Sequence, residues 1–125
     1  MDPAGVVLYQ KNFGTARVLA KHLSQHVQRV HLARTCEEIR PKITQYRARV
    51  LVLDLENSCL NEVKRLHEEF PALSIVCTHR LADDELWTAV LNEGAADICE
   101  PCNIADVVRS VVREQSGATA SAAAA

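Results

Sequence analysis

The sequence predicts an α/β domain of three layers, in which helices cover both faces of a parallel sheet. Short apolar runs alternate five times with helical patterns along the 125 residues, and such alternation is typical of parallel sheets. The run Val50–Leu55 contains five aliphatic residues and one carboxylate, as expected for a strand buried on both faces. The short connections require right-handed crossovers, so we expect a doubly wound (βα)5 sheet.

Length and composition are those of an ordinary single domain. The chain is 48% hydrophobic and carries a net charge of -2, without a basic stripe for nucleic acid or an apolar run long enough to span a membrane. The first five residues do not resemble a signal peptide, so we expect a cytoplasmic protein. The five cysteines are an odd number within apolar segments, which suits free thiols better than disulfides.

The first half of the chain contains two strand–helix units. We expect Gly5–Gln10 to be the first strand and Val27–Leu32 to be a second strand near the sheet edge. The helix between them has its apolar face at Ala16, Leu19, Ala20 and Leu23. Thr35–Glu38 has the form of a capping box, although Pro41 requires the second helix to be kinked or to begin near that proline.

The second half begins with the central strand and continues with two further units. A helical repeat starts at Leu60 and stops before Pro71. Leu73–Thr78 is the next buried strand, and the acidic residues 83–85 mark the start of a fourth helix, where the helix dipole favours negative charge. We expect Gly94 to end that helix.

The last unit combines a short strand and a long apolar helix. We expect Asp97–Cys99 to form the fifth strand and Asn103 to cap the final helix. The apolar face of that helix contains Ile104, Val107, Val108, Val111 and Val112. Residues 116–125 are rich in Ala and Ser, which predicts a linker or disordered tail after a domain of residues 1–115.

A site in such a sheet is expected at the carboxyl ends of the strands. The strand order 2-1-3-4-5 would bring the loops after the first and third strands together at the switch point. Asp54 ends the central strand and is therefore the first candidate site residue. An aspartate at this position also serves commonly as a turn former or helix cap.

Three segments resemble the receiver domain of two-component response regulators, like the chemotaxis regulator. They are Val50–Asp54, Ser74–Thr78, and Leu91–Ile98 followed by Glu100-Pro101. Their order and spacing agree with that family over residues 5–115. The resemblance implies a flavodoxin-like fold with the strand order 2-1-3-4-5.

The resemblance also implies a phosphorylation site whose residues are only partly present. In the family, an aspartate accepts the phosphoryl group, two acids hold Mg²⁺, a lysine neutralises the phosphoryl oxygens and a hydroxyl follows them. Asp54 matches the phosphoacceptor and Thr78 the switch hydroxyl, but Gln10 and Lys11 stand at the acid positions and Glu100 at the lysine position. Mg²⁺ requires oxygen ligands, so amides and amines do not replace acids.

These differences predict an atypical, or pseudo, receiver that keeps the fold and has lost Mg²⁺-dependent phosphorylation. We expect the Lys11 ammonium to take part of the Mg²⁺ space and to pair with Asp54 or Glu100, keeping those acids ionised. Glu100 would repel a phosphoryl group. The family usually holds the peptide bond before the proline cis, which implies a cis bond before Pro101.

The expected function is a protein-interaction module in phosphorelay signal transduction that works without phosphorylation. We expect no enzymatic activity, no cofactor and no Mg²⁺ site, and a protein partner or fused output domain instead of nucleic acid or membrane. The family commonly docks partners or a second copy on its fourth helix, fifth strand and fifth helix. Trp87 and Arg109 are candidates for that face, while burial in the apolar stripe is the alternative for Trp87.

Two other functions remain open. Asp54 could be a working phosphoacceptor in an unusual geometry. Alternatively, Cys99-Glu100-Pro101-Cys102 is a C-x-P-C sequence that opens a helix, where a thiol can become reactive and act as a redox switch. Only one helix follows Cys102, unlike thioredoxin-like folds. His22 and His26 share a helix face but lack the further ligands of a metal site.

Overall fold

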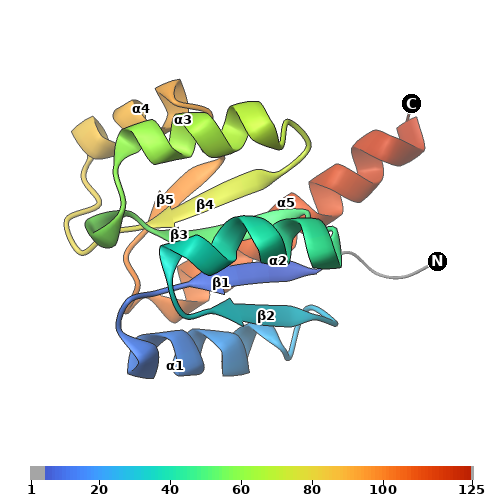
Figure 1. The fold of residues 1–125 in the computed structure, drawn as a ribbon, viewed down its shortest axis with the longest axis horizontal. Coiled ribbons are helices and arrows are strands. Elements are labelled where there is room, and N and C mark those ends of the chain that lie inside the picture. The colour runs from blue at the N-terminus through green and yellow to red at the C-terminus, as the bar shows by residue number, and fades with distance from the viewer. Residues whose placement is uncertain (1–4, 125) are drawn as a thin grey trace.

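The computed structural model describes the backbone of residues 5–124 and the side chains of residues 5–116. It confirms a five-stranded parallel sheet (Figure 1). The strands are β1 (Val6–Tyr9), β2 (Val30–Ala33), β3 (Val50–Asp54), β4 (Ser74–Thr78) and β5 (Asp97–Cys99). Their order is β2-β1-β3-β4-β5, so β3 is central and β2 and β5 are the edges, as the sequence predicts.

Helices cover both faces of this sheet and complete the three layers. The helices are α1 (Phe13–Leu23), α2 (Ile39–Tyr46), α3 (Leu60–Glu69), α4 (Asp84–Asn92) and α5 (Ile104–Ala124). One face packs against α1 and α5, and the other packs against α2, α3 and α4. Two short 3-10 turns, η1 (Cys36–Glu38) and η2 (Leu55–Asn57), precede α2 and α3.

The alternation of side chains along β1 divides the core into two parts. Val6 and Leu8 pack with the apolar faces of α1 and α5, whereas Val7 and Tyr9 pack with those of α2 to α4. All residues of Val50–Asp54 are buried, because β3 has a strand on each side and helices on both faces. Full burial of a valine or leucine contributes about 1.5–3 kcal/mol, so this strand anchors the position of Asp54 at its end.

The entry into α2 differs from the predicted capping box. The Thr35 hydroxyl makes no capping hydrogen bond, because the Glu38 amide instead donates to the Thr35 carbonyl (3.2 Å) in the η1 turn. The α2 helix begins at Ile39, which places Pro41 in its first turn. Proline lacks a backbone N–H, but the amides of the first turn have no partner within the helix, so no helical hydrogen bond is lost.

The carboxyl-terminal segment is helical where the composition predicted a linker or disordered tail. The backbone of α5 continues to Ala124, and Ala125 lies outside the described residues. Alanine has the highest intrinsic helix propensity. This propensity accounts for helical backbone in the Ala-rich end of α5, which follows the apolar face of the helix. No helix within residues 5–124 is both long and apolar enough to cross a membrane.

Candidate functional site

The ends of three adjacent strands bring most of the predicted site residues together. Asp54 is the last residue of β3 and is paired in register with Thr78, the last residue of β4. Gln10 and Lys11 directly follow β1, which lies on the other side of β3. These residues therefore meet at the carboxyl edge of the sheet, as expected for a doubly wound fold.

The Asp54 carboxylate is buried and accepts three hydrogen bonds. Asp54 is only 5% exposed. Oδ2 accepts from the Lys11 amide (3.1 Å) and from Asn57 Nδ2 (2.7 Å), and Oδ1 accepts from the Glu56 amide (3.0 Å). Asp54 thus lies at the carboxyl edge of the sheet and caps η2, which confirms the helix-cap interpretation, while its role as a site residue stays a prediction.

A side-chain hydrogen bond joins Gln10 to Thr78 above the end of β3. Gln10 Nε2 donates to Thr78 Oγ1 at 2.7 Å, and the two residues are 5% and 1% exposed. Little water competes for a buried hydrogen bond, so an unsatisfied donor or acceptor at such a position costs folding free energy. The residue at an expected acid position is therefore bound to the residue at the switch-hydroxyl position.

Lys11 contacts Asp54 through its backbone and not through its ammonium. The side chain of Lys11 is exposed, and none of the ion pairs among the described side chains involves Lys11 or Glu100. The predicted pairing of Lys11 with Asp54 or Glu100 is therefore wrong. The physical reason is that three other donors already satisfy the carboxylate, while the ammonium remains in water.

An ion pair lies at the mouth of the site. Arg80 Nε is 2.6 Å from Glu56 Oε1, and the hydrogen bond from Arg80 lowers the pKa of the Glu56 carboxyl. Both side chains line a cavity of about 600 Å³. The other lining residues are Gln10, Lys11, Asn12, Thr15, Asp54, Asn57 and Pro101. Sequence reasoning did not indicate this ion pair.

Pro101 lines this cavity, and Glu100 is not among its lining residues. The Glu100 side chain is exposed. The peptide bond before Pro101 is trans, since residues 5–124 contain no cis bond, so the cis bond implied by the resemblance is wrong. Trans is the more stable isomer of most X–Pro bonds, and the Asn103 amide closes the following turn on the Glu100 carbonyl (3.0 Å).

The two cysteines of the C-x-P-C segment lie in different environments. Cys99 is buried in β5 while Cys102 is exposed, and both are free thiols. Burial raises the pKa of the Cys99 thiol to about 11 and that of Cys77 on the neighbouring strand to about 12. Both buried cysteines therefore behave as small apolar core residues, and within the C-x-P-C segment only Cys102 is accessible to reagents.

The donor set of the cavity does not fit a receiver-type Mg²⁺ site. The two acid positions hold an amide and an ammonium, and the Glu56 carboxylate is paired with Arg80. Within the described residues, no group of three or more His, Cys, Asp or Glu side chains is placed to hold a metal ion. Mg²⁺ requires oxygen ligands in near-octahedral geometry, which leaves Asp54 without acidic co-ligands.

Comparison with known proteins identifies the fold. No family model and no curated protein matches the sequence. The signal receiver domain of a putative Luxo repressor protein from Vibrio parahaemolyticus matches in structure with a TM-score of 0.85, covering 99% of this chain and 98% of that chain at 16% identity. The chain has the receiver-domain fold.

Other solved receiver structures support this assignment of the fold. An orphan response regulator of H. pylori, HP1043, has a TM-score of 0.72 at 14% identity, with 88% of this chain and 98% of that chain covered. The response regulator DrrB of Thermotoga maritima has a TM-score of 0.78 at 20% identity, with 90% of this chain covered. This receiver fold spans 52% of the DrrB chain, so DrrB contains a further part.

Three features of the site were missed by sequence reasoning. They are the donor role of Asn57 to Asp54, the Gln10–Thr78 hydrogen bond, and the capping of α1 by Asn12, whose Oδ1 accepts from the Thr15 amide (3.0 Å). An asparagine three residues after a strand-ending aspartate, and an asparagine just before an apolar helix, are the signals that could have indicated two of them.

Proposed function

We propose that this chain is an atypical receiver module of two-component-type signal transduction, which acts on a protein partner or fused output domain without phosphorylation of Asp54. The receiver fold supports the signalling class, and the longer DrrB chain illustrates how such a domain is combined with a further part. In this proposal the domain has no enzymatic activity and needs no cofactor. It works in the cytoplasm, where buried thiols such as Cys77 and Cys99 stay reduced.

The hydrogen bond between Gln10 and Thr78 is the observation that carries this proposal. In the family, the hydroxyl at the Thr78 position must be available to follow a phosphoryl group on the aspartate. Here the hydroxyl oxygen already accepts from a buried amide at 2.7 Å. Breaking this contact in a nearly water-free position costs about 1–3 kcal/mol. The Thr78 side chain is therefore held toward Gln10 before any phosphoryl group arrives, and its O–H is the one hydrogen atom left to donate.

The surroundings of Asp54 support the same proposal. Its carboxylate oxygens are already engaged by two backbone amides and by Asn57. A phosphoryl group would have to displace some of these donors, and Glu100 stands at the position of the family's lysine. The phosphoryl group would also approach without the acids that place Mg²⁺ in the family.

A Mg²⁺ titration followed by NMR chemical shifts tests the proposal. We expect the wild-type domain to give no saturable shifts around Asp54. The triple variant Gln10→Asp/Lys11→Asp/Glu100→Lys restores the family's charge pattern, and we expect it to show saturable shifts of the Asp54 region. Saturable Mg²⁺ binding by the wild type, lost in Asp54→Ala, would contradict the proposal.

A further inference from the structure

Helix α4 carries an exposed aromatic side chain beside acidic residues. Trp87 is 47% exposed and Leu81, just before the helix, is 73% exposed, so the alternative that Trp87 is buried in the apolar stripe is wrong. Asp84 lies three residues before Trp87 and shares its side of the helix. Trp combines a large apolar surface with a polar N–H and is enriched where proteins meet. This acidic, aromatic end of α4 has the composition of a docking element.

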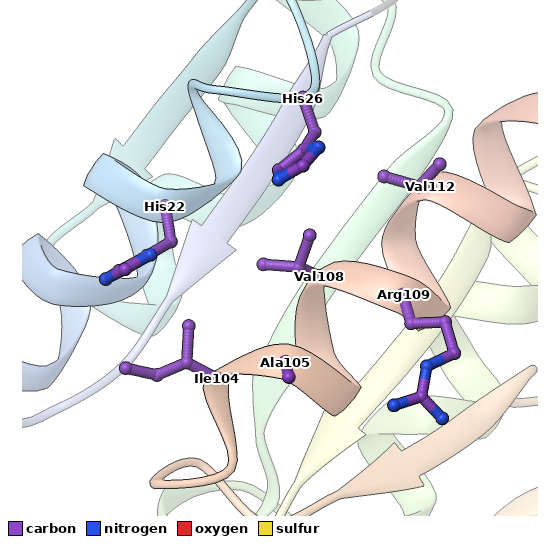
Figure 2. A pocket seen from close by; sticks show the side chains of 7 residues that line it. All are labelled: His22, His26, Ile104, Ala105, Val108, Arg109 and Val112. Carbon is purple, nitrogen blue, oxygen red and sulfur yellow. The ribbon is translucent and has the colours of Figure 1, made fainter.

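A groove of about 510 Å³ lies between α1 and α5 (Figure 2), and it shares no lining residue with the Asp54 cavity. Figure 2 shows two histidines of the α1 side facing aliphatic side chains of α5. The lining residues are His22, His26, Ile104, Ala105, Val108, Arg109 and Val112. Arg109 lies at the edge of the groove, where it pairs with Asp106 (2.9 Å). The groove is therefore apolar inside, with two imidazoles and one guanidinium at its border.

The charges of the two halves of the chain have opposite sign. Residues 5–49 contain nine Lys and Arg against two Glu, whereas residues 50–106 contain three Lys and Arg against twelve Asp and Glu. Of those nine cations, only Arg40 forms an ion pair among the described residues. In the fold, α1 and β2 lie at one edge of the sheet and α4 and β5 at the other (Figure 1). The molecule is thus basic at one edge and acidic at the other.

We propose that the α1–α5 groove binds the α4 surface of a second copy of this chain, with Trp87 entering the groove. The groove has apolar walls, and its volume is within the range of ligand pockets. Arg17 and Lys21 are exposed on α1, which contains no acidic residue, and they would face the acids beside Trp87. Opposite charges on the two surfaces favour this orientation over groove-to-groove or α4-to-α4 contact.

The proposed contact is heterologous, because two different surfaces meet. A bound pair still offers one free groove on one copy and one free Trp87 on the other, so copies assemble head to tail and association rises with concentration. This differs from the two-fold contact through α4, β5 and α5 that the resemblance implies, which stays a prediction. The inference goes beyond the proposed function and stands whether or not Asp54 accepts a phosphoryl group.

The fluorescence of Trp87 offers a direct test, because it is the only tryptophan in the chain. We expect sedimentation velocity to show growing oligomers between about 1 µM and about 1 mM, the range of weak to moderate association. The emission maximum should move to shorter wavelength over the same range, and added salt should reverse both changes. A wild-type chain that stays monomeric with unchanged emission would overturn the proposal and leave the groove to a different protein.

Mixing two variants distinguishes this contact from a symmetric one. Trp87→Ala retains the groove, while Ala105→Glu adds an acid inside the groove and retains Trp87. Ala105 is exposed in the first turn of α5, where glutamate is compatible with the helix dipole. The control Asn61→Glu places the same charge in the first turn of α3, far from the groove in the fold.

We expect each groove or tryptophan variant alone to associate more weakly than wild type by more than about tenfold, and Asn61→Glu to behave as wild type. The mixture of Trp87→Ala and Ala105→Glu should form one-to-one dimers and blue-shift the single tryptophan. A mixture without dimers would overturn the proposal, as would self-association that depends on Trp87 but is unaffected by Ala105→Glu. Circular dichroism melting of each variant verifies that it is folded.

Discussion

The side-chain amide of Gln10 donates a 2.7 Å hydrogen bond to the hydroxyl of Thr78, and the two residues come from strands on opposite sides of β3. The bond crosses the end of the strand that carries Asp54. It connects two positions that the receiver family uses for separate tasks, one for the metal and one for the switch. In the proposed function, this contact holds the edge of the sheet in one arrangement.

The Gln10–Thr78 bond should contribute measurably to stability. We expect Gln10→Ala to lower the free energy of unfolding by about 1–3 kcal/mol, because it leaves the buried Thr78 hydroxyl without its donor. Urea denaturation of Gln10→Ala, Thr78→Val and the double variant gives the coupling energy between the two side chains. We expect a coupling of about 0.5–3 kcal/mol, and a value near zero would show that the bond is not formed in solution.

Asn57 should hold the Asp54 carboxylate in place. Its Nδ2 donates to Asp54 Oδ2 at 2.7 Å, and hydrogen bonds to charged groups contribute about 1.5–3 kcal/mol when buried. Asn57 is exposed, so we expect Asn57→Ala to cost about 1 kcal/mol, less than a buried bond of this kind would. Thermal denaturation measures this loss, and Asn61→Ala on the neighbouring helix is the matched control. Equal melting temperatures of both variants would contradict the role of Asn57.

His31 should make stability depend on pH. Its ring stacks on Tyr46 with centroids 3.6 Å apart, and its Nε2 is buried without a partner among the described residues. Burial, together with Lys42 and Arg29, lowers the pKa of His31 below its ordinary value of 6.5. The unfolded chain therefore takes up a proton at His31 before the folded chain does as the pH falls.

From this difference we expect the His31 contribution to stability to be complete above pH 6.5 and to decrease as the pH falls toward the lowered folded pKa. His31→Phe keeps an aromatic ring for the stack and removes the titration. Urea denaturation at several pH values should give a shallower slope for His31→Phe than for the wild type below pH 6.5. Parallel slopes would refute the assignment to His31.

Gly94 should tolerate no side chain at the end of α4. Its φ is +103°, and a Cβ would lie 2.5 Å from the His67 ring. We expect Gly94→Ala to destabilise the domain by about 1–3 kcal/mol, through backbone strain and this close approach. The double variant Gly94→Ala/His67→Ala removes the close approach and should recover part of the loss in a denaturation experiment. Recovery of the whole loss would mean that the backbone conformation is unimportant.

The five thiols should react with iodoacetamide at very different rates. Cys102, Cys36 and Cys59 are exposed, whereas Cys77 and Cys99 are buried and have raised pKa values. We expect mass spectrometry of the folded domain to find three rapidly alkylated sites and two protected ones. Rapid alkylation of Cys99 would revive a redox role for the Cys99–Cys102 pair.

Most of the fold was predictable because the relevant patterns are local and strong. The aliphatic run Val50–Leu53 and the glycine at position 94 indicated a buried central strand and the end of α4, and both are confirmed. The capping box at Thr35 failed because a backbone turn took the amide that the hydroxyl was expected to bind. Trp87 was ambiguous because it adjoins the apolar stripe, and its exposure depends on how α4 is rotated against α3 and β5.

The candidate site was only partly predictable. Asp54 was a candidate because it ends the central strand, and Thr78 was one through the resemblance; the structure pairs them in register, and their roles stay predictions. The partner of Gln10 depends on the distance between β1 and β4, which sequence neighbours do not reveal, and the Lys11 ammonium was wrongly placed because charge alone suggested a pair. Hydrogen bonds between side chains of distant strands follow from packing, so they required the structure.

Intact-mass spectrometry after incubation of the wild-type domain with Mg²⁺ and a small-molecule phosphodonor tests the central claim most directly. A conventional receiver verifies the reagent, and Asp54→Ala identifies any adduct on this residue. We predict no phosphoryl adduct on the wild type, because Gln10 already binds the Thr78 hydroxyl and Asn57 already binds the Asp54 carboxylate. A stoichiometric adduct that disappears in Asp54→Ala would contradict the claim and make this chain a working phosphoacceptor.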